Sequence, residues 1–205
     1  MGVFVKICGM ASGEDAREVA ALGPDAMGFI FWSGSKRSVQ PEMVAEWSKD
    51  LPDDLIKAGV FVDAGMDEIS RAMDTAGLDL IQLHGSETPE FVNGFDCRKW
   101  KAVHLDRYQE ETISDYRVDA FLVDSYSIGS PGGTGLICDW EAARRFVREH
   151  SVPVLLAGGL SPDNVSSAIR EVQPWGVDVV SGVEKSPGRK DIEKVRAFIQ
   201  ACRNQ

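Results

Sequence analysis

The sequence lacks several features, and each absence argues against a class of protein. Its 205 residues contain no apolar run long enough to span a membrane, so we expect no membrane association. Acidic residues outnumber basic residues by 32 to 22, which gives a formal net charge of −10. No stripe of Lys and Arg offsets this excess, so a nucleic-acid partner is not expected either. An anionic ligand would have to be bound by backbone amides and one or two basic side chains.

Cysteine and histidine are few and scattered. The four cysteines include no C-x-x-C pair, and the three histidines are equally far apart. This spacing predicts neither a metal site nor a disulfide scaffold. A strand-like pattern begins within a few residues of Met1 and leaves no room for a signal peptide, so we expect a cytoplasmic chain with reduced thiols.

What the sequence does contain is a regular alternation of short apolar segments with helical ones. The expected strands are residues 3–8, 26–31, 56–62, 78–83, 100–104, 120–123, 152–156 and 177–180. Helices are expected to begin at Pro41 and after Ser12, Thr88 and Ser161, where Pro162 takes the first helical position. The other expected helices are residues 66–76, ended by Gly77, 139–149 and 191–202, with a further short helix after His104.

These strands are continuous runs rich in Val, Ile, Leu and Phe, as is typical of parallel strands buried on both faces. Eight such units predict an α/β protein with a (β/α)8 TIM barrel, a single domain over residues 1–205. A doubly wound open sheet is the alternative fold. That fold usually has five or six strands and a G-x-G-x-x-G motif after the first, which is missing here.

Residues that follow barrel strands are candidates for catalysis, and two of them suit proton transfer. Cys8 ends the first strand, and Asp124 ends the sixth. A thiolate near helix N-termini can act as a general base, and a carboxylic acid in a dry site can act as a general acid. Each residue also has a purely structural interpretation. Cys8 could be a small buried apolar residue, and Asp124 could cap the loop that follows it.

Other strand ends suggest a binding site for a phosphate. Gly158-Gly159 and Ser181-Gly182 follow the seventh and eighth strands, where barrels often hold phosphate on backbone amides. Arg37, beside Lys36 in the loop after the second strand, could bind a carboxylate or could simply be solvated. His84 could act at the site or be a structural histidine.

Ten short motifs in register reveal a resemblance over essentially the whole chain. They are KICG (6–9), GFIF (28–31), SKR (35–37), GVFV (59–62), QLHG (82–85), LVDS (122–125), GGTG (132–135) with DW (139–140), LAGGL (156–160) with NV (164–165), VDVVSGVE (177–184) and PGRKD (187–191). Together they resemble the phosphoribosylanthranilate isomerase family, the barrel enzymes of tryptophan biosynthesis.

The resemblance implies an Amadori rearrangement of N-(5-phosphoribosyl)anthranilate to 1-(2-carboxyphenylamino)-1-deoxyribulose 5-phosphate. It implies that Asp124 is the general acid, that Cys8 is the general base and that Arg37 holds the anthranilate carboxylate. Gly159, Ser181 and Gly182 match the phosphate-binding loops, and Gly158, His84 and Asp178 complete the expected substrate-binding set. No metal or other cofactor is expected, because the substrate's own nitrogen supplies the electron sink. The expected partner is this phosphosugar, for a monomer or homodimer.

One departure from the family pattern falls in the expected phosphate loop. Family members commonly have Ser-Ser-Gly-Val-Glu where this chain has Val180-Ser181-Gly182-Val183-Glu184, which removes one hydroxyl and keeps the backbone donors. The glycine-rich loop 129–135 is expected to close over substrate and exclude water. The sequence offers no function for Cys138.

Two other functions are compatible with a phosphosugar barrel. One is a different barrel enzyme, such as the isomerase of histidine synthesis or a decarboxylase. The first of these would have carboxylates after strands one and five, where this chain has Cys8 and His104, and the D-x-K-x-x-D array of the second is missing. The other is a non-catalytic binding barrel, which would require neither Cys8 nor Asp124.

Overall fold

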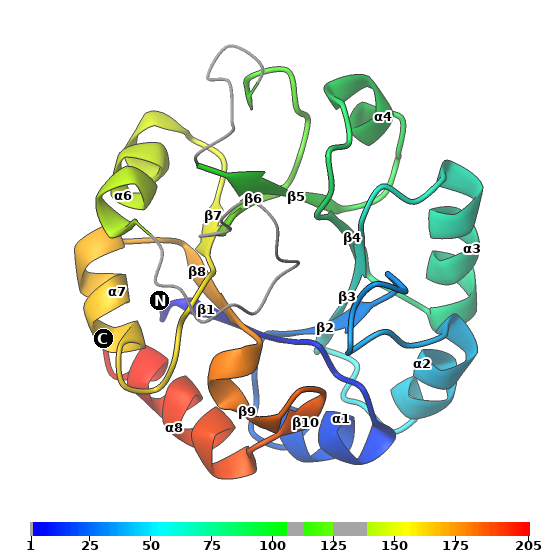
Figure 1. Ribbon diagram of the computed structural model, residues 1–205, viewed down its shortest axis with the longest axis horizontal. Coiled ribbons are helices and arrows are strands. Elements are labelled where there is room, and N and C mark those ends of the chain that lie inside the picture. The colour runs from blue at the N-terminus through cyan, green and yellow to red at the C-terminus, as the bar shows by residue number, and fades with distance from the viewer. Residues whose placement is uncertain (1, 106–112, 125–138) are drawn as a thin grey trace.

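The computed structural model describes residues 2–105, 113–124 and 139–205. Within these residues eight parallel strands pair in chain order, and the last pairs with the first, so the sheet closes into a barrel (Figure 1). The strands are β1 (Phe4–Cys8), β2 (Ala26–Ile30), β3 (Ile56–Phe61), β4 (Leu80–Leu83), β5 (Lys99–His104), β6 (Ala120–Asp124), β7 (Val154–Leu156) and β8 (Gly176–Val179). The predicted (β/α)8 barrel is confirmed.

Helices surround this barrel on the outside, as Figure 1 shows. They are α1 (Gly13–Ala20), α2 (Pro41–Ser48), α3 (Met66–Ala76), α4 (Pro89–Asn93), α6 (Trp140–Glu149), α7 (Val165–Val172) and α8 (Ile192–Arg203). Their boundaries follow local chemistry. Ser12 accepts a hydrogen bond from the Asp15 amide to start α1, and Gly77 ends α3 in the left-handed conformation with φ 60°.

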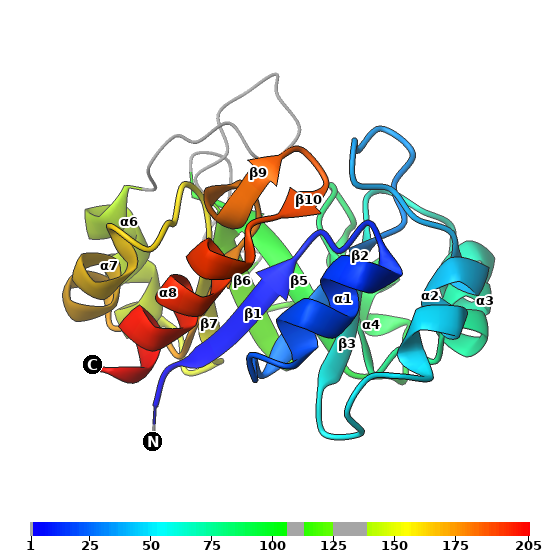
Figure 2. The same ribbon diagram turned by 90° about the horizontal axis from the view of Figure 1, so that it is seen from below.

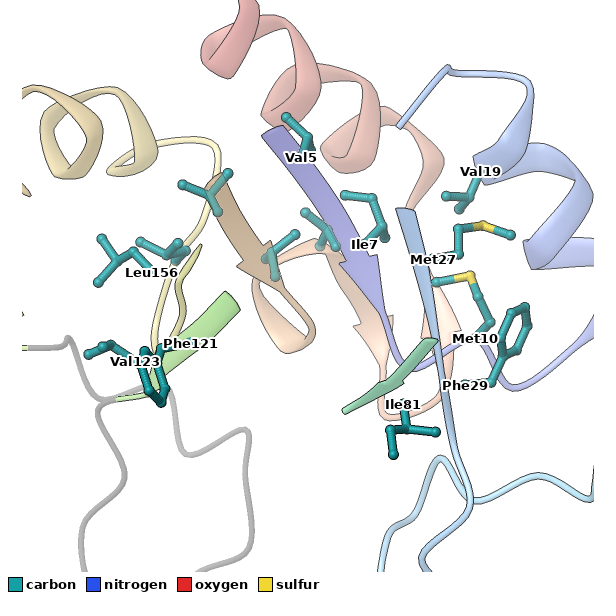
Figure 3. Packing of buried hydrophobic residues seen from close by; sticks show 14 of the residues in the cluster. Val5, Ile7, Met10, Val19, Met27, Phe29, Ile81, Phe121, Val123 and Leu156 are labelled. Atoms are coloured by element: carbon teal, nitrogen blue, oxygen red, sulfur yellow. The ribbon is translucent and has the colours of Figure 1, made fainter. Parts of the chain in front are cut away.

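The side chains of each strand alternate between two separate cores. Val5 and Ile7 of β1 point outward and pack with side chains such as Met27 and Val19 between the sheet and the helices (Figure 3). Inside the barrel, a smaller apolar cluster gathers around Trp100 and Leu122. Lys6 and Cys8 lie on the inward face of β1, so the polar residues of this strand sit above the inner core.

Apart from shifts of one residue at several ends, the elements differ from the sequence prediction in three ways. Helix α7 begins at Val165, whereas the prediction of a start at Ser161-Pro162 is wrong. The Asn164 side chain causes the delay, because its Oδ1 accepts from the Ser161 amide at 2.8 Å and its Nδ2 donates to the Gly159 carbonyl at 2.9 Å. Strands β4 and β7 are each two residues shorter at the start than predicted.

The third difference is a small antiparallel hairpin after β8 that the sequence did not predict. A 3-10 turn, η1 (Ser181–Val183), leads into β9 (Glu184–Ser186), which pairs with β10 (Arg189–Lys190). Figure 2 shows this hairpin at the end of the barrel where the strands finish, with both chain termini toward the other end. The hairpin therefore lies beside the mouth where the site is expected.

Several predictions fall on residues outside the described ranges. The short helix expected after His104 falls in a segment of which residues 106–112 are outside these ranges, and the loop 129–135 and Cys138 lie within residues 125–138. Among the described residues, no helix combines the length and apolar content needed to cross a membrane. In the same residues no cluster of three His, Cys, Asp or Glu side chains could hold a metal ion.

Candidate active site

A pocket of about 660 Å³ opens at the barrel mouth, where the carboxyl ends of the strands meet. Every residue that the sequence predicted for the site lines it: Cys8, Arg37, His84, Asp124, Gly158, Gly159, Asp178, Ser181 and Gly182. The closed barrel thus gathers residues from strand ends that are far apart in the chain. The pocket is the place to look for chemistry.

Cys8 is the last residue of β1 and is almost completely buried, with 3% of its surface exposed. Burial raises the pKa of its thiol, the nearby Lys6 ammonium lowers it, and the Asp178 carboxylate raises it again; the net direction is upward. The thiol is therefore held in a dry environment that contains strong compensating charges.

Asp124 is the last residue of β6 and reaches the same cavity as Cys8. Its Oδ2 lies 3.4 Å from Nε2 of His84, which follows β4. The other ring nitrogen of His84, Nδ1, lies 2.9 Å from the side-chain amide nitrogen of Gln82. A hydrogen bond donated by this amide to Nδ1 corresponds to the His84 tautomer with its ring proton on Nε2, toward Asp124.

Arg37 lies at the pocket wall with its guanidinium fixed by Glu184 of β9. Its Nε donates to Oε1 at 2.7 Å and its Nη2 to Oε2 at 2.6 Å. The hydrogen bonds with Glu184 raise the pKa of Arg37, which stays charged. A bidentate pair of this kind fixes the direction of the whole guanidinium plane.

The loops after β7 and β8 line the pocket on the side of the expected phosphate. Gly158 and Gly159 both have positive φ, 83° and 65°, a backbone conformation that suits glycine. A Cβ on Gly182 would lie 1.9 Å from the carbonyl oxygen of Leu160, so the two loops touch backbone to backbone. Glycine at 182 is required by this close approach.

Sequence reasoning assigned no role to four polar residues that the structure places around the site: Lys6, Gln82, Glu184 and Lys190. Lys6 donates to Asp178 Oδ1 at 2.9 Å, and Lys190 donates to the Cys8 carbonyl at 2.7 Å. All four are less than 10% exposed. For Lys6 and Gln82, a charged or amide side chain inside an otherwise apolar strand was the available signal, since such groups are seldom buried without a partner. Glu184 and Lys190 lie in short polar strands and offered no such signal.

The comparison with known proteins agrees with this geometry. Residues 5–201 match the family described as N-(5′-phosphoribosyl)anthranilate (PRA) isomerase. The chain is 46% identical over 196 residues to the N-(5′-phosphoribosyl)anthranilate isomerase of Geobacter sp. (strain M21), with 95% of each chain covered. The chain belongs to the N-(5′-phosphoribosyl)anthranilate isomerase family.

Solved structures of phosphoribosylanthranilate isomerases share this fold. The enzyme from Thermus thermophilus superposes with a TM-score of 0.87 at 35% identity, with 96% of each chain covered. A second isomerase, in complex with reduced 1-(o-carboxyphenylamino)-1-deoxyribulose 5-phosphate, superposes with a TM-score of 0.84 at 32% identity, covering 99% of this chain and 100% of the other. The resemblance to the phosphoribosylanthranilate isomerase family is confirmed.

Proposed function

We propose that Asp124 and Cys8 act as general acid and general base in the Amadori rearrangement of N-(5′-phosphoribosyl)anthranilate to 1-(2-carboxyphenylamino)-1-deoxyribulose 5-phosphate. The observation that carries these roles is that a thiol and a carboxyl group, from β1 and β6, line one pocket in a chain of this family. These roles require Asp124 in its protonated form and Cys8 as its thiolate when the substrate reacts.

The reaction proceeds in two proton-transfer stages. Asp124 gives its proton to the ribose ring oxygen, the bond from that oxygen to C1 breaks, and the nitrogen lone pair forms a Schiff base. The Cys8 thiolate then removes the proton from C2, and the electron pair moves toward the iminium nitrogen to give an enolamine. Tautomerisation of the enolamine yields the ketone, so the step is an isomerisation without net oxidation.

The remaining residues orient the substrate. Arg37 binds the anthranilate carboxylate, and Glu184 holds its guanidinium in position. Gly158, Gly159, Ser181 and Gly182 bring backbone amides close to the phosphate. His84 keeps Asp124 in place through its Nε2 proton. Asp178 also lines the pocket, where its carboxylate accepts from Lys6.

The wider setting of the protein is also a proposal. A similar solved structure is described as mutually generated monomers of the dimeric phosphoribosylanthranilate isomerase from Thermotoga maritima. We therefore propose that this chain acts as a monomer or a homodimer. We propose a cytoplasmic location, with the phosphosugar as its partner and no role for a nucleic acid.

Steady-state turnover tests the two roles. The fluorescence decay of phosphoribosylanthranilate is followed with the unsubstituted protein, Cys8→Ala and Asp124→Asn. Each variant is expected to lose a factor of about 100 to 10,000 in kcat, because a positioned acid or base contributes that much. Cys97→Ala and Asp67→Asn are the matched controls, since Cys97 lies before β5 and Asp67 is exposed on α3.

Product binding separates an enzyme from a binding barrel. Both inactive variants should still bind a reduced product analogue with near-normal affinity. Turnover that survives in Cys8→Ala or Asp124→Asn would remove the role assigned to that residue. Folded, unsubstituted protein without turnover would favour the non-catalytic binding barrel.

A further inference from the structure

Lys6 is a charged side chain in the interior of the barrel. It is fully buried at 0% exposure, and its ammonium donates to Asp178 Oδ1 at 2.9 Å. The two residues are neighbours in the register of β1 and β8, so the pair spans the seam where the barrel closes. Burying an ammonium is costly even with a partner, and well-packed apolar residues often stabilise such a position as well or better. Stability alone therefore gives a weak reason for lysine here.

The position of Lys6 relative to Cys8 suggests a different reason. The two residues are two apart on one strand, so their side chains share the inward face of β1. A Cβ built on Gly28 would lie 2.4 Å from Cys8 Sγ and 3.1 Å from Lys6 Nζ. The Lys6 ammonium and the Cys8 sulphur therefore both lie against the same point of β2, close to each other. Burial lowers the pKa of Lys6, but Asp178 and Cys8 raise it more, so the amine stays protonated.

Other charged groups from the neighbouring elements also surround Cys8. From β10, Lys190 donates to the Cys8 carbonyl at 2.7 Å and lies 3.4 Å from Glu184 of β9. From the loop after β2, Arg37 pairs with Glu184, and from β8, Asp178 pairs with Lys6. Asp15, which accepts from the Lys190 amide, has Arg189 as its outer partner at 4.0 Å. Of these groups, Lys6 lowers the pKa of the Cys8 thiol more than Lys190 does, and burial lowers the pKa of Lys190 itself.

We propose that Lys6 is a positioning residue for the base: its ammonium, oriented by Asp178, stabilises the Cys8 thiolate beneath the substrate pocket. The inference rests on the proposed role of Cys8 and deepens it, because the Lys6 ammonium offsets part of the burial that raises the pKa of the Cys8 thiol. Asp178 acts here through Lys6. Its own negative charge opposes the thiolate, so the two members of the pair have opposite effects on Cys8.

These opposite effects provide a test, because a purely structural role for Lys6 and Asp178 would not shift the ionisation of Cys8 in opposite directions. The ionisation of Cys8 is measured without substrate, as the ultraviolet absorbance of the thiolate against pH, after subtraction of the same protein carrying Cys8→Ser. Lys6→Met is expected to move the midpoint upward by about one pH unit or more, since a neighbouring opposite charge shifts a pKa by about 1 to 3 units. Asp178→Asn, which keeps an oxygen for Lys6, is expected to move it downward. The upward shift of the Cys8 midpoint in Lys6→Met should also appear in the pH profile of kcat/KM.

Lys101→Met is the matched control. Lys101 of β5 is also an almost fully buried ammonium, paired with Glu87 at 3.0 Å, but it donates to the carbonyls of Leu83, Gly85 and Ala102 and not toward Cys8. Its loss should leave the Cys8 midpoint unchanged. If Lys6→Met does not fold, Asp178→Asn alone decides: a downward shift supports the proposal, and an unchanged or raised midpoint overturns it.

Equal shifts in Lys6→Met and Lys101→Met, or shifts of the same sign in Lys6→Met and Asp178→Asn, would overturn the proposal. Turnover of Cys8→Ala judges the separate question of whether Cys8 is the base. Retained turnover in that variant with the expected titration would leave Lys6 as the stabiliser of a thiolate that the reaction does not use. The two failures are therefore distinguishable.

Discussion

At the scale of single residues, the site depends on a glycine that leaves space as well as on the side chains that fill it. Gly28 lies opposite Cys8 in the β1–β2 register, and the space of its missing Cβ is taken by the Cys8 sulphur and the Lys6 ammonium. The proposed base therefore has its position only because residue 28 is glycine.

Replacing Gly28 by alanine should displace the thiol. The added Cβ would lie 2.4 Å from Sγ, which no side chain tolerates, so Cys8 must turn or β2 must move. We expect kcat to fall by about 100-fold, the cost of a misplacement near 1 Å. The control is Gly65→Ala, where a Cβ meets nothing within 4 Å. Equal turnover in the two variants would contradict the assigned position of the base.

Gln82 should matter through the histidine that it orients. Its amide donates to His84 Nδ1 at 2.9 Å and so directs the Nε2 proton to Asp124. Gln82→Leu removes this donor and frees the other tautomer, so kcat should fall by about tenfold while the affinity for product analogue changes little. Steady-state kinetics and analogue titration measure the two effects, with Gln200→Leu at an exposed position of α8 as the control. An unchanged kcat would remove Gln82 from the site.

At the scale of elements, the β9–β10 hairpin connects the mouth of the barrel to Arg37, the residue proposed to bind the substrate carboxylate. Glu184 of β9 accepts both guanidinium bonds from Arg37 and also faces Lys190 of β10. The hairpin packs where Figure 2 shows it, beside the ends of the strands. A short added element thus determines the direction of a residue from the loop after β2.

Glu184→Gln should weaken substrate binding more than it slows the chemical step. The amide can accept one bond from Arg37 but not the charge-assisted pair, so the guanidinium loses its fixed plane. We expect KM to rise by about tenfold with a smaller change in kcat, measured by initial rates over a range of substrate concentrations. Glu193→Gln, at an exposed position of α8, is the control. A fall in kcat with unchanged KM would place Glu184 in the chemical step.

Glu184 should also make stability depend on pH. Burial raises the pKa of this carboxyl, but the hydrogen bond from Arg37 and the charge of Lys190 together lower it by more, so the pKa lies below its usual value of 4.5. A lowered folded-state pKa stabilises the fold above the unfolded pKa, and the contribution disappears as pH falls through the folded one. The difference in unfolding free energy between the protein and Glu184→Gln should therefore be full at neutral pH and shrink below about pH 4. A difference that grows toward acid would contradict this direction.

The sequence predicted the elements better where local chemistry decides them than where packing does. Helix α3 was predicted with its observed ends because Gly77 stops it locally. The predicted start of α7 was wrong because the Asn164 side chain bonds back to the Ser161 amide and the Gly159 carbonyl, and the regular helix begins only after it. The hairpin has strands of three and two residues, too short for any periodic pattern, and it exists through its contacts at the mouth. Lys6 was assigned no role because a single lysine in a short strand does not reveal that its ammonium pairs with Asp178 where β1 meets β8.

At the scale of the whole molecule, the barrel closes only when the first and last parts of the chain meet. Strand β1 pairs with β8, and Arg203 at the end of α8 donates to the Val3 carbonyl at 2.9 Å and to Asp25 at 2.8 Å. Asp25 in turn accepts from the Val5 amide at 2.7 Å. Since Lys6 and Cys8 lie on β1, the site exists only in the closed barrel.

This closure predicts that damage to the last helix unfolds the whole barrel. Phe198 of α8 is fully buried in the outer core, so Phe198→Ala should lower the unfolding free energy by about 3 to 5 kcal/mol. Far-UV circular dichroism and tryptophan fluorescence should report one coincident transition in denaturant, because Trp100 lies inside the barrel and α8 outside it. Arg196→Ala, on the exposed face of the same helix, should leave the transition in place. Separate transitions for the two signals would mean that α8 detaches while the barrel stays closed, and the site would then not depend on the end of the chain.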